Sequence, residues 1–323
     1  MAKPFFIVGA PRTGSTLLRR LLNNHSKLAI PPESGFLVEY LLADHLSLDK
    51  RKKIFIKEPE FDYWGVRPEW DDIYNLQSMI DCIRFMHETY AQENGKDFWG
   101  QKTPKLVRTG ALWLDQMPDC RIIHMVRDPR AVVSSLRASK YHNLHIIQGS
   151  QRYLKDTRLG IELESNYGER VLRVSYEDLV TQPQRTLTSI CDFIDLPFEE
   201  KLLSDDQLVK LTPNEQKFGH HQNVGGNLKP SFMEKWNKSL NSREIAIIES
   251  ITSELQNELS YPYTNPQPPT EKELANARSH QRVHAIKHAW KELTQRPDFW
   301  RIAKRRWQLG NVRKMLTDHS KGM

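Results

Sequence analysis

The strongest constraint on the fold is a glycine-containing loop close to the N-terminus. Residues 9–16 read GAPRTGST; they follow the apolar run FFIVG at 5–9 and precede a stretch of helical periodicity at 16–22. This order of buried strand, glycine loop and helix places the free N–H groups of a helix start around an anion. The frame matches the phosphate-binding loop G-x-x-x-x-G-K-[ST], except that Ser15 replaces the lysine of ATP- and GTP-binding loops. We therefore predict a phosphate site made by the backbone, with Arg12 as the cation inside the loop.

Two later segments repeat the order of strand, turn and helix. RIIHMV at 121–126 precedes RDPRAVVSSL, in which Asp128 is the expected N-cap and Pro129 the first helical residue. RVLRV at 170–174 precedes SYEDL and a further helical stretch. Strands that alternate with helices predict an α/β fold, here a P-loop-type three-layer fold with a central parallel sheet and a helical C-terminal extension. His124, inside the second of these strands, is expected to be a packed strand residue.

The C-terminal part of the chain differs from the rest in composition. Residues 261–269 read YPYTNPQPP, which is typical of a linker or strap. We therefore divide the chain into a phosphate-binding domain at 1–260, this Pro-rich segment, and a basic helical extension at 270–323. The formal net charge is +7, yet residues 278–323 alone carry twelve Lys or Arg against three Asp or Glu. The body is thus nearly neutral, and we expect no nucleic-acid partner.

The apolar runs and the cysteines of the sequence indicate the cellular compartment. No run of about 18 apolar residues occurs, and the apolar stretch at the N-terminus is too short for a secretory signal. The three cysteines (Cys82, Cys120 and Cys191) are far apart in the chain, which excludes a disulfide framework and a CxxC metal site. We expect a soluble protein in the reducing cytoplasm.

The motifs resemble those of a known family. FFIVGAPRTGSTLLRRLLNNH resembles the 5′-phosphosulfate loop of the sulfotransferases that use 3′-phosphoadenosine 5′-phosphosulfate (PAPS). In MVRDPRAVVSSL, Arg127 and Ser135 match the spacing of the second motif of that family, and the resemblance covers about residues 4–259. It implies transfer of a sulfuryl group from PAPS to a hydroxyl or amine acceptor, with release of 3′,5′-adenosine bisphosphate.

The same resemblance implies a cofactor site. Its residues are Arg12, Thr13, Gly14, Ser15 and Thr16 at the 5′-phosphosulfate, Arg127 and Ser135 at the 3′-phosphate, Tyr176 near the adenine, and Asn227 and Lys229 in a late loop that folds over the cofactor. The tyrosine has an alternative role as a half-buried core residue, and the late loop could instead be an ordinary turn with a solvated lysine.

The resemblance also implies catalytic residues, and no metal, because arginine and lysine supply the positive charge. Lys102, together with Arg12, would stabilise the charge that develops on the bridging oxygen. The histidine base of small-molecule cytosolic sulfotransferases is absent, since that segment here reads Lys102-Thr103-Pro104. The chain is closer to the protein-tyrosine, polysaccharide and bacterial branches, which implies Glu33 as the base, with a pKa raised beside a partly dry site. The alternative for Glu33 is an ordinary loop or N-cap carboxylate.

Two other functions fit parts of the sequence. A P-loop kinase or nucleotidase would bind Mg-ATP, and Ser15 argues against it. A nucleotide-binding module without catalysis would use the basic tail to dock to a partner or membrane. The tail itself pairs an apolar stripe with basic residues, so it either packs on the body or on a second subunit, or touches an anionic membrane surface or acceptor. The i, i+4, i+8 spacing of His280, His284 and His288 is expected to be an exposed helix face rather than a metal site.

Overall fold

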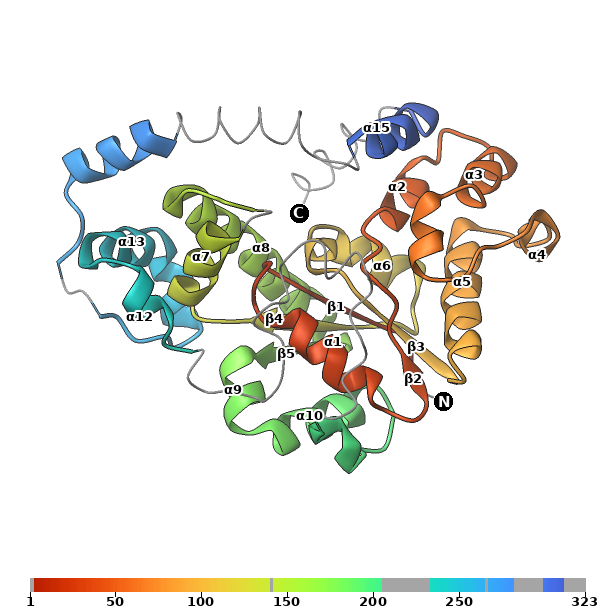
Figure 1. Ribbon diagram of the computed structural model, residues 1–323, viewed down its shortest axis with the longest axis horizontal. Coiled ribbons are helices and arrows are strands. Elements are labelled where there is room, and N and C mark those ends of the chain that lie inside the picture. Colours follow the sequence, from red (N-terminus) through yellow and green to blue (C-terminus); the bar gives the residue numbers. More distant parts are fainter. Residues whose placement is uncertain (1–2, 140–141, 205–232, 265–266, 282–298, 311–323) are drawn as a thin grey trace.

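The structure is a computed structural model that describes residues 3–139, 142–204, 233–264, 267–281 and 299–310. In these residues a parallel β-sheet forms the centre of the fold (Figure 1). The five strands are β1 (Phe5–Gly9), β2 (Leu28–Ala29), β3 (Phe98–Lys102), β4 (Arg121–Val126) and β5 (Val171–Ser175), in the order β2-β3-β1-β4-β5. All pairings are parallel, and β1 lies at the centre between β3 and β4. The predicted parallel α/β fold is confirmed, and β2 and β3 are strands that the sequence patterns did not reveal.

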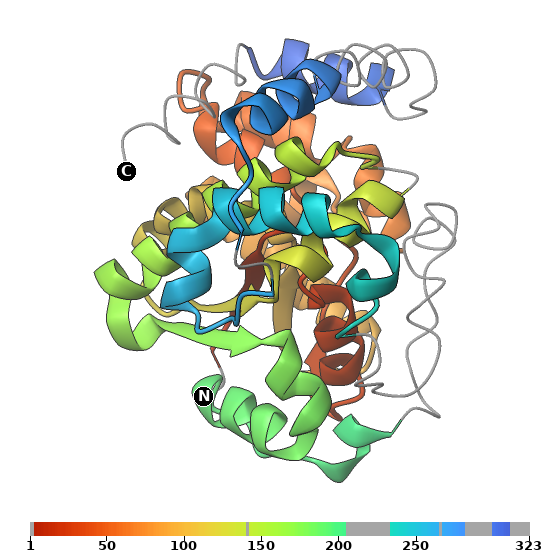
Figure 2. The ribbon, with the colours of Figure 1, turned by 90° about the vertical axis from the view of Figure 1, so that its left-hand side faces the viewer.

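Helices cover both faces of the sheet because both faces are apolar. Along β1, Phe5 and Ile7 belong to one buried cluster, and Phe6 and Val8 to the other. The first cluster includes residues of α1 (Ser15–Asn23), α9 (Tyr176–Thr181) and α10 (Pro183–Phe193). The second includes residues of α5 (Met79–Glu93), α6 (Gly110–Gln116) and α8 (Ile146–Tyr167). Figures 1 and 2 show these layers on opposite sides of the sheet, which confirms the three-layer prediction.

The helix after β4 begins as the sequence predicts. α7 (Pro129–Ala138) has Pro129 as its first residue, and the Asp128 side chain accepts a hydrogen bond from the backbone N–H of Arg130 at 2.8 Å. Two later helices, α12 (Trp236–Ser239) and α13 (Ser242–Glu258), pack against α7. The remaining short elements are α2 (Leu37–Leu42), α3 (Leu48–Phe55), η1 (Pro59–Tyr63), α4 (Trp70–Ile73), η2 (Pro104–Thr109), η3 (Gly168–Arg170) and η4 (Glu200–Leu203).

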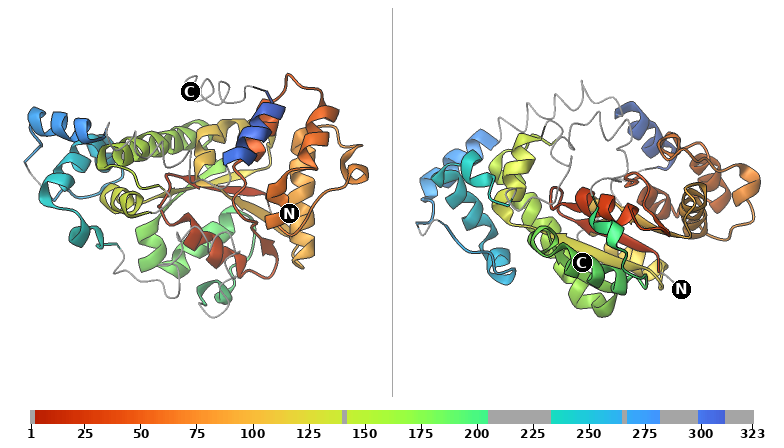
Figure 3. Two further views of the ribbon diagram at one scale, coloured as in Figure 1. Left: turned by 45° about the horizontal axis from the view of Figure 1, so that its top comes forward. Right: turned by 60° about the horizontal axis from the view of Figure 1, so that its bottom comes forward.

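The described parts of the C-terminal extension lie at opposite ends of the molecule (Figure 3). The helix at 271–281 packs on α13, with Leu274 and Ala277 beside the apolar cluster there. The helix α15 (Phe299–Gln308) lies near α2, and Leu309 just after it is buried in the main core. Trp300 and Trp307 of α15 face outward, 79% and 83% exposed. Among the described residues, no helix has both the length and the apolar character needed to cross a bilayer. His284 and His288 lie outside the described residues.

A buried arginine fastens α15 to the body. Arg305 donates to Glu39 at 2.8 Å, to Glu60 at 3.0 Å and to Glu58 at 3.1 Å. Glu58 also accepts a hydrogen bond from the hydroxyl of Tyr40 at 2.7 Å. Burial opposes the charge of Arg305, but the carboxylates outweigh this effect and raise its pKa, while burial raises the pKa of Glu58 to about 8. Without Arg305, Glu39 would keep its contacts with Arg306, and Glu58 would lose the arginine that contacts it.

We expect Arg305→Met to lower the free energy of unfolding by about 3–5 kcal/mol, because removing one partner of a buried ion pair leaves the others uncompensated. Urea unfolding followed by circular dichroism measures the change. The control is Lys304→Ala on the exposed side of the same helix, which should stay within about 0.5 kcal/mol of the wild type. Equal unfolding midpoints for the two variants would show that the ion pairs of Arg305 do not stabilise the fold.

Candidate active site

The loop between β1 and α1 has the backbone shape of an anion cradle. Arg12 and Gly14 have positive φ angles of 75° and 93°, and the hydroxyl of Thr13 donates to the carbonyl oxygen of Ala10 at 2.8 Å. The helix starts at Ser15 with Gly14 as N-cap, so no side chain caps its first N–H groups, and its first turn contains no acidic residue. The helix start is therefore open to an external anion.

Tyr176 lies directly against this loop. A Cβ atom on Gly14 would come within 2.5 Å of the tyrosine ring, so only glycine fits there. The guanidinium of Arg127 lies 3.9 Å from the centre of the same ring, within the range of a cation–π contact. Burial raises the pKa of Tyr176, and the positive charge of Arg127 opposes this rise. The structure thus brings the buried Tyr176 together with the loop and with Arg127.

Arg12, Arg127 and Ser135 converge beside the loop. Arg12 donates from Nε to the hydroxyl of Ser135 at 2.9 Å, and Arg127 donates to the carbonyl oxygen of Arg12 at 3.3 Å. Burial lowers the pKa of Arg12, and the neighbouring charge of Arg127 lowers it further, although Glu33 opposes both. The sequence motifs assigned Arg12 and Ser135 to opposite ends of the cofactor, and the structure brings them into contact. The guanidinium groups of Arg12 and Arg127 are each suited to bind a phosphate-sized anion.

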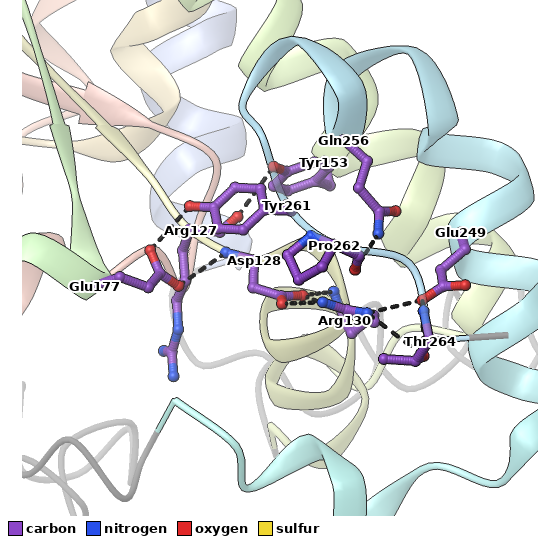
Figure 4. A network of polar contacts seen from close by, with 10 residues as sticks. All are labelled: Arg127, Asp128, Arg130, Tyr153, Glu177, Glu249, Gln256, Tyr261, Pro262 and Thr264. Atoms are coloured by element: carbon purple, nitrogen blue, oxygen red, sulfur yellow. Dashed lines mark hydrogen bonds and ion pairs between the residues drawn. The ribbon is translucent and has the colours of Figure 1, made fainter.

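The backbone at Arg127 is held by three residues that the sequence did not single out (Figure 4). Tyr153 donates to the carbonyl oxygen of Arg127 at 3.0 Å, and Glu177 accepts from the N–H of Asp128 at 3.1 Å. Tyr261 donates to the second oxygen of Glu177 at 2.9 Å. Burial raises the pKa of Glu177. The SYED segment, with its carboxylate next to the candidate tyrosine, was the only sequence signal for Glu177.

Arg130 ties the start of α7 to α13 (Figure 4). Its guanidinium donates to both oxygens of Asp128, at 3.0 and 2.6 Å, and to Glu249 at 2.8 Å. It also lies 4.3 Å from the ring centre of Trp236. Thr264 in the Pro-rich segment donates to the same oxygen of Glu249. The turn that carries Arg127 is therefore anchored by helices and by the segment after α13.

Glu33 and Lys102 form an ion pair beside the loop. Lys102 stands at the end of β3, only 1% of its side chain is exposed, and it donates to Glu33 and, at 3.2 Å, to the hydroxyl of Thr16. The Glu33 side chain is 52% accessible. The surrounding protein still desolvates it, which raises its pKa, but Lys102 outweighs this effect, so the pKa is lowered. The expected raised pKa is thus wrong, because the sequence could not place an ammonium group on this carboxylate.

Of the other predicted residues, the structure describes one and leaves two outside the described ranges. His124 is fully buried in β4, with Nδ1 2.5 Å from a carboxylate oxygen of Glu164, so its prediction as a packed residue is confirmed. Asn227 and Lys229 lie outside the described residues.

The sheet and the site together define an α/β protein of the P-loop type with an anion-binding loop after its first strand. The chain belongs to the sulfotransferase family, whose family model matches residues 4–200.

Similar proteins agree with this assignment. The protein-tyrosine sulfotransferase of Drosophila melanogaster is 24% identical over 63% of this chain and 40% of its own length. A putative protein-tyrosine sulfotransferase of Caenorhabditis briggsae is 24% identical over 72% of this chain and 79% of its own. The sulfotransferase domain of the Synechococcus PCC 7002 olefin synthase superposes with a TM-score of 0.59 at 26% identity, over 81% of this chain and 96% of that domain. The chain spans about half the length of several curated relatives.

We expect Gly14→Ala to destabilise the protein by about 1–3 kcal/mol more than Gly95→Ala does, because overpacking adds to backbone strain. Both glycines have positive φ, but a Cβ on Gly95 would meet nothing within 4 Å, whereas one on Gly14 would strike Tyr176. Urea unfolding of the two variants measures the difference. Equal losses would mean that the tyrosine ring moves aside freely.

Proposed function

We propose that this chain is a PAPS-dependent sulfotransferase that moves a sulfuryl group to a hydroxyl or amine acceptor and releases 3′,5′-adenosine bisphosphate. The observation that carries the proposal is the convergence of Arg12, Arg127 and Ser135 beside the phosphate loop. ATP has no 3′-phosphate, so a second anion site at the end of β4 favours PAPS over ATP. Membership of the sulfotransferase family supports the same choice over a kinase, a nucleotidase or a non-catalytic module.

The residues present fit PAPS. Arg12 and the N–H groups of Thr13–Thr16 would hold the 5′-phosphosulfate, and Arg127 with Ser135 the 3′-phosphate. Tyr176, packed on Gly14 and under Arg127, would border the adenine. When bound, PAPS supplies the sulfuryl group in a form that a nucleophile can attack.

The ion pair supplies the acid–base chemistry. Glu33 would take the proton of the acceptor, and Lys102 with Arg12 would place positive charge where negative charge develops. Because Lys102 lowers the pKa of Glu33, the carboxylate is ionised and ready to accept a proton at neutral pH. The half-exposed position of Glu33 lets an acceptor reach it, while the buried lysine stays fixed.

The acceptor and the cellular location are narrower parts of the proposal. A phenolic hydroxyl is our first choice of acceptor, because several relatives are named protein-tyrosine sulfotransferases. Cys82, Cys120 and Cys191 are buried free thiols, which favours a reducing, cytoplasmic location. The outward Trp300 and Trp307 of α15 are the candidates for a peripheral membrane or subunit contact.

Calorimetric binding of 3′,5′-adenosine bisphosphate, compared with Mg-ADP, tests the cofactor. We expect the wild type to prefer the bisphosphate, and Arg127→Ala to weaken its binding about 10- to 100-fold, because a charge-assisted contact is lost. The control is Arg185→Ala on the exposed surface of α10, which should bind as the wild type does. A preference for Mg-ADP, or indifference to Arg127, would favour a kinase or nucleotidase instead.

Initial rates with PAPS and N-acetyltyrosinamide test the catalytic pair. Glu33→Gln should lower kcat by about 10²–10⁴-fold and leave bisphosphate binding unchanged, because it removes only the base. Lys102→Met should lower kcat and also move the rising limb of the pH–rate profile to higher pH, since the pKa of Glu33 rises without the ammonium group. A Glu33→Gln enzyme with normal kcat would eliminate Glu33 as the base.

A further inference from the structure

A buried row of polar side chains lies behind the Glu33–Lys102 pair. His87 on α5, Gln101 on β3, and Thr103 and Ser34 in the following segments are all fully buried. Buried polar groups persist where their hydrogen bonds are satisfied and hold neighbouring backbone in one place. Gln101 and Thr103 are the sequence neighbours of Lys102, and Ser34 is the neighbour of Glu33. The row therefore connects the backbones of the two partners.

The contacts along this row are continuous. The backbone N–H of Ser34 donates to the Thr103 hydroxyl oxygen at 3.0 Å, and the Gln101 side-chain amide donates to the same oxygen at 2.8 Å. His87 lies 2.8 Å from the Gln101 side-chain oxygen through Nε2, and 2.7 Å from the carbonyl oxygen of Ile83 through Nδ1. We call residues 30–36, between β2 and α2, the Glu33 loop. The Thr103 hydroxyl is thus the point where this loop is hydrogen-bonded to the residue that follows Lys102.

The far end of the row is rigid. The His87 ring lies 4.4 Å from the ring centre of Trp99 and 4.9 Å from that of Trp64. Burial lowers the pKa of His87 to about 4, so the ring is neutral at physiological pH and its single N–H donates to one of these two oxygens. It acts as an anchor rather than as a proton donor to the reaction.

The Glu33 loop is held at its other end by different residues. Arg19 donates from Nε to the carbonyl oxygen of Ile30 at 3.0 Å, and Asn23 both donates to and accepts from the backbone of Ile30. Between Ile30 and the next helix, the Ser34–Thr103 bond links this segment to β3. Without that bond, the ion pair with Lys102 would still link Glu33 to β3.

We propose that Thr103 is a positioning residue, whose hydroxyl holds the Glu33 loop in register with Lys102 and so keeps the base against its cation. This role rests on the proposed function for its catalytic consequence, but the geometry it describes exists without catalysis. Gln101 and His87 support this role because they fix the orientation of the Thr103 side chain.

The test uses Thr103→Val, which keeps the shape and removes the hydroxyl, and Thr103→Ser, which restores it. The control is Thr252→Val, because that buried hydroxyl donates within α13, to the carbonyl oxygen of Ile248 at 2.8 Å. The first measurement is the titration of Glu33 by carbon NMR of protein labelled at the glutamate carboxyls, with Glu33→Gln assigning the resonance. We expect Thr103→Val to raise the pKa of Glu33, and the serine and control variants to leave it unchanged.

The second measurement is the rate with PAPS and N-acetyltyrosinamide. Thr103→Val should lower kcat about 10-fold or more with bisphosphate binding within about twofold of wild type, and Thr103→Ser should recover the rate. If Thr103→Val does not fold, Gln101→Met tests the same row and should shift Glu33 in the same direction. An unchanged Glu33 titration in a folded variant would overturn the proposal. A wild type that does not bind 3′,5′-adenosine bisphosphate, together with a shifted titration, would instead contradict the proposed function and leave the positioning role standing.

Discussion

The contacts that bring Arg12, Arg127 and Ser135 together beside the phosphate loop are the arrangement on which the candidate site depends. Burial lowers the pKa of Arg12, and the positive charge of Arg127 lowers it further. The arrangement therefore needs fixed support: the ring of Tyr176 beneath Arg127, and the bonds from Tyr153 and Glu177 to the adjoining backbone. A bound polyanion would offset the positive charge of both arginines.

The ion pair of Lys102 and Glu33 also lies beside the phosphate loop, where Lys102 contacts Thr16. Lys102 would be costly to bury alone, and Glu33 and the Thr16 hydroxyl compensate its charge. The same contact sets the pKa of Glu33 in the direction that keeps it ionised. Because β3 neighbours β1 in the sheet, the lysine at the end of β3 stands beside the loop at the end of β1. The carboxyl ends of parallel strands meet at one edge, and that edge gathers the site.

Residues that follow α13 also contact the N-terminal part of the chain. Tyr261 reaches Glu177, next to the candidate cofactor tyrosine, and Arg305 reaches the buried carboxylates of Glu39 and Glu58. Both contacts involve carboxylates that belong to the N-terminal part of the chain: Glu177 in the first, and Glu39 and Glu58 in the second. The folding of the nucleotide-binding body is therefore coupled energetically to residues that lie far beyond its sequence motifs.

The sequence by itself determined the features whose signals are local. The glycine loop after an apolar strand, Asp128 with Pro129 at a helix start, and the eight-residue step from Arg127 to Ser135 each follow from backbone geometry within a few turns of chain. The tertiary structure alone decided the rest. The short strands β2 and β3 lack a clear periodic pattern, and the Arg12–Ser135 contact joins residues 123 apart. The lowered pKa of Glu33 and the roles of Thr103 and Arg305 depend on which groups meet in space, because charge and burial act through distance in the folded chain and leave no mark on the neighbouring sequence.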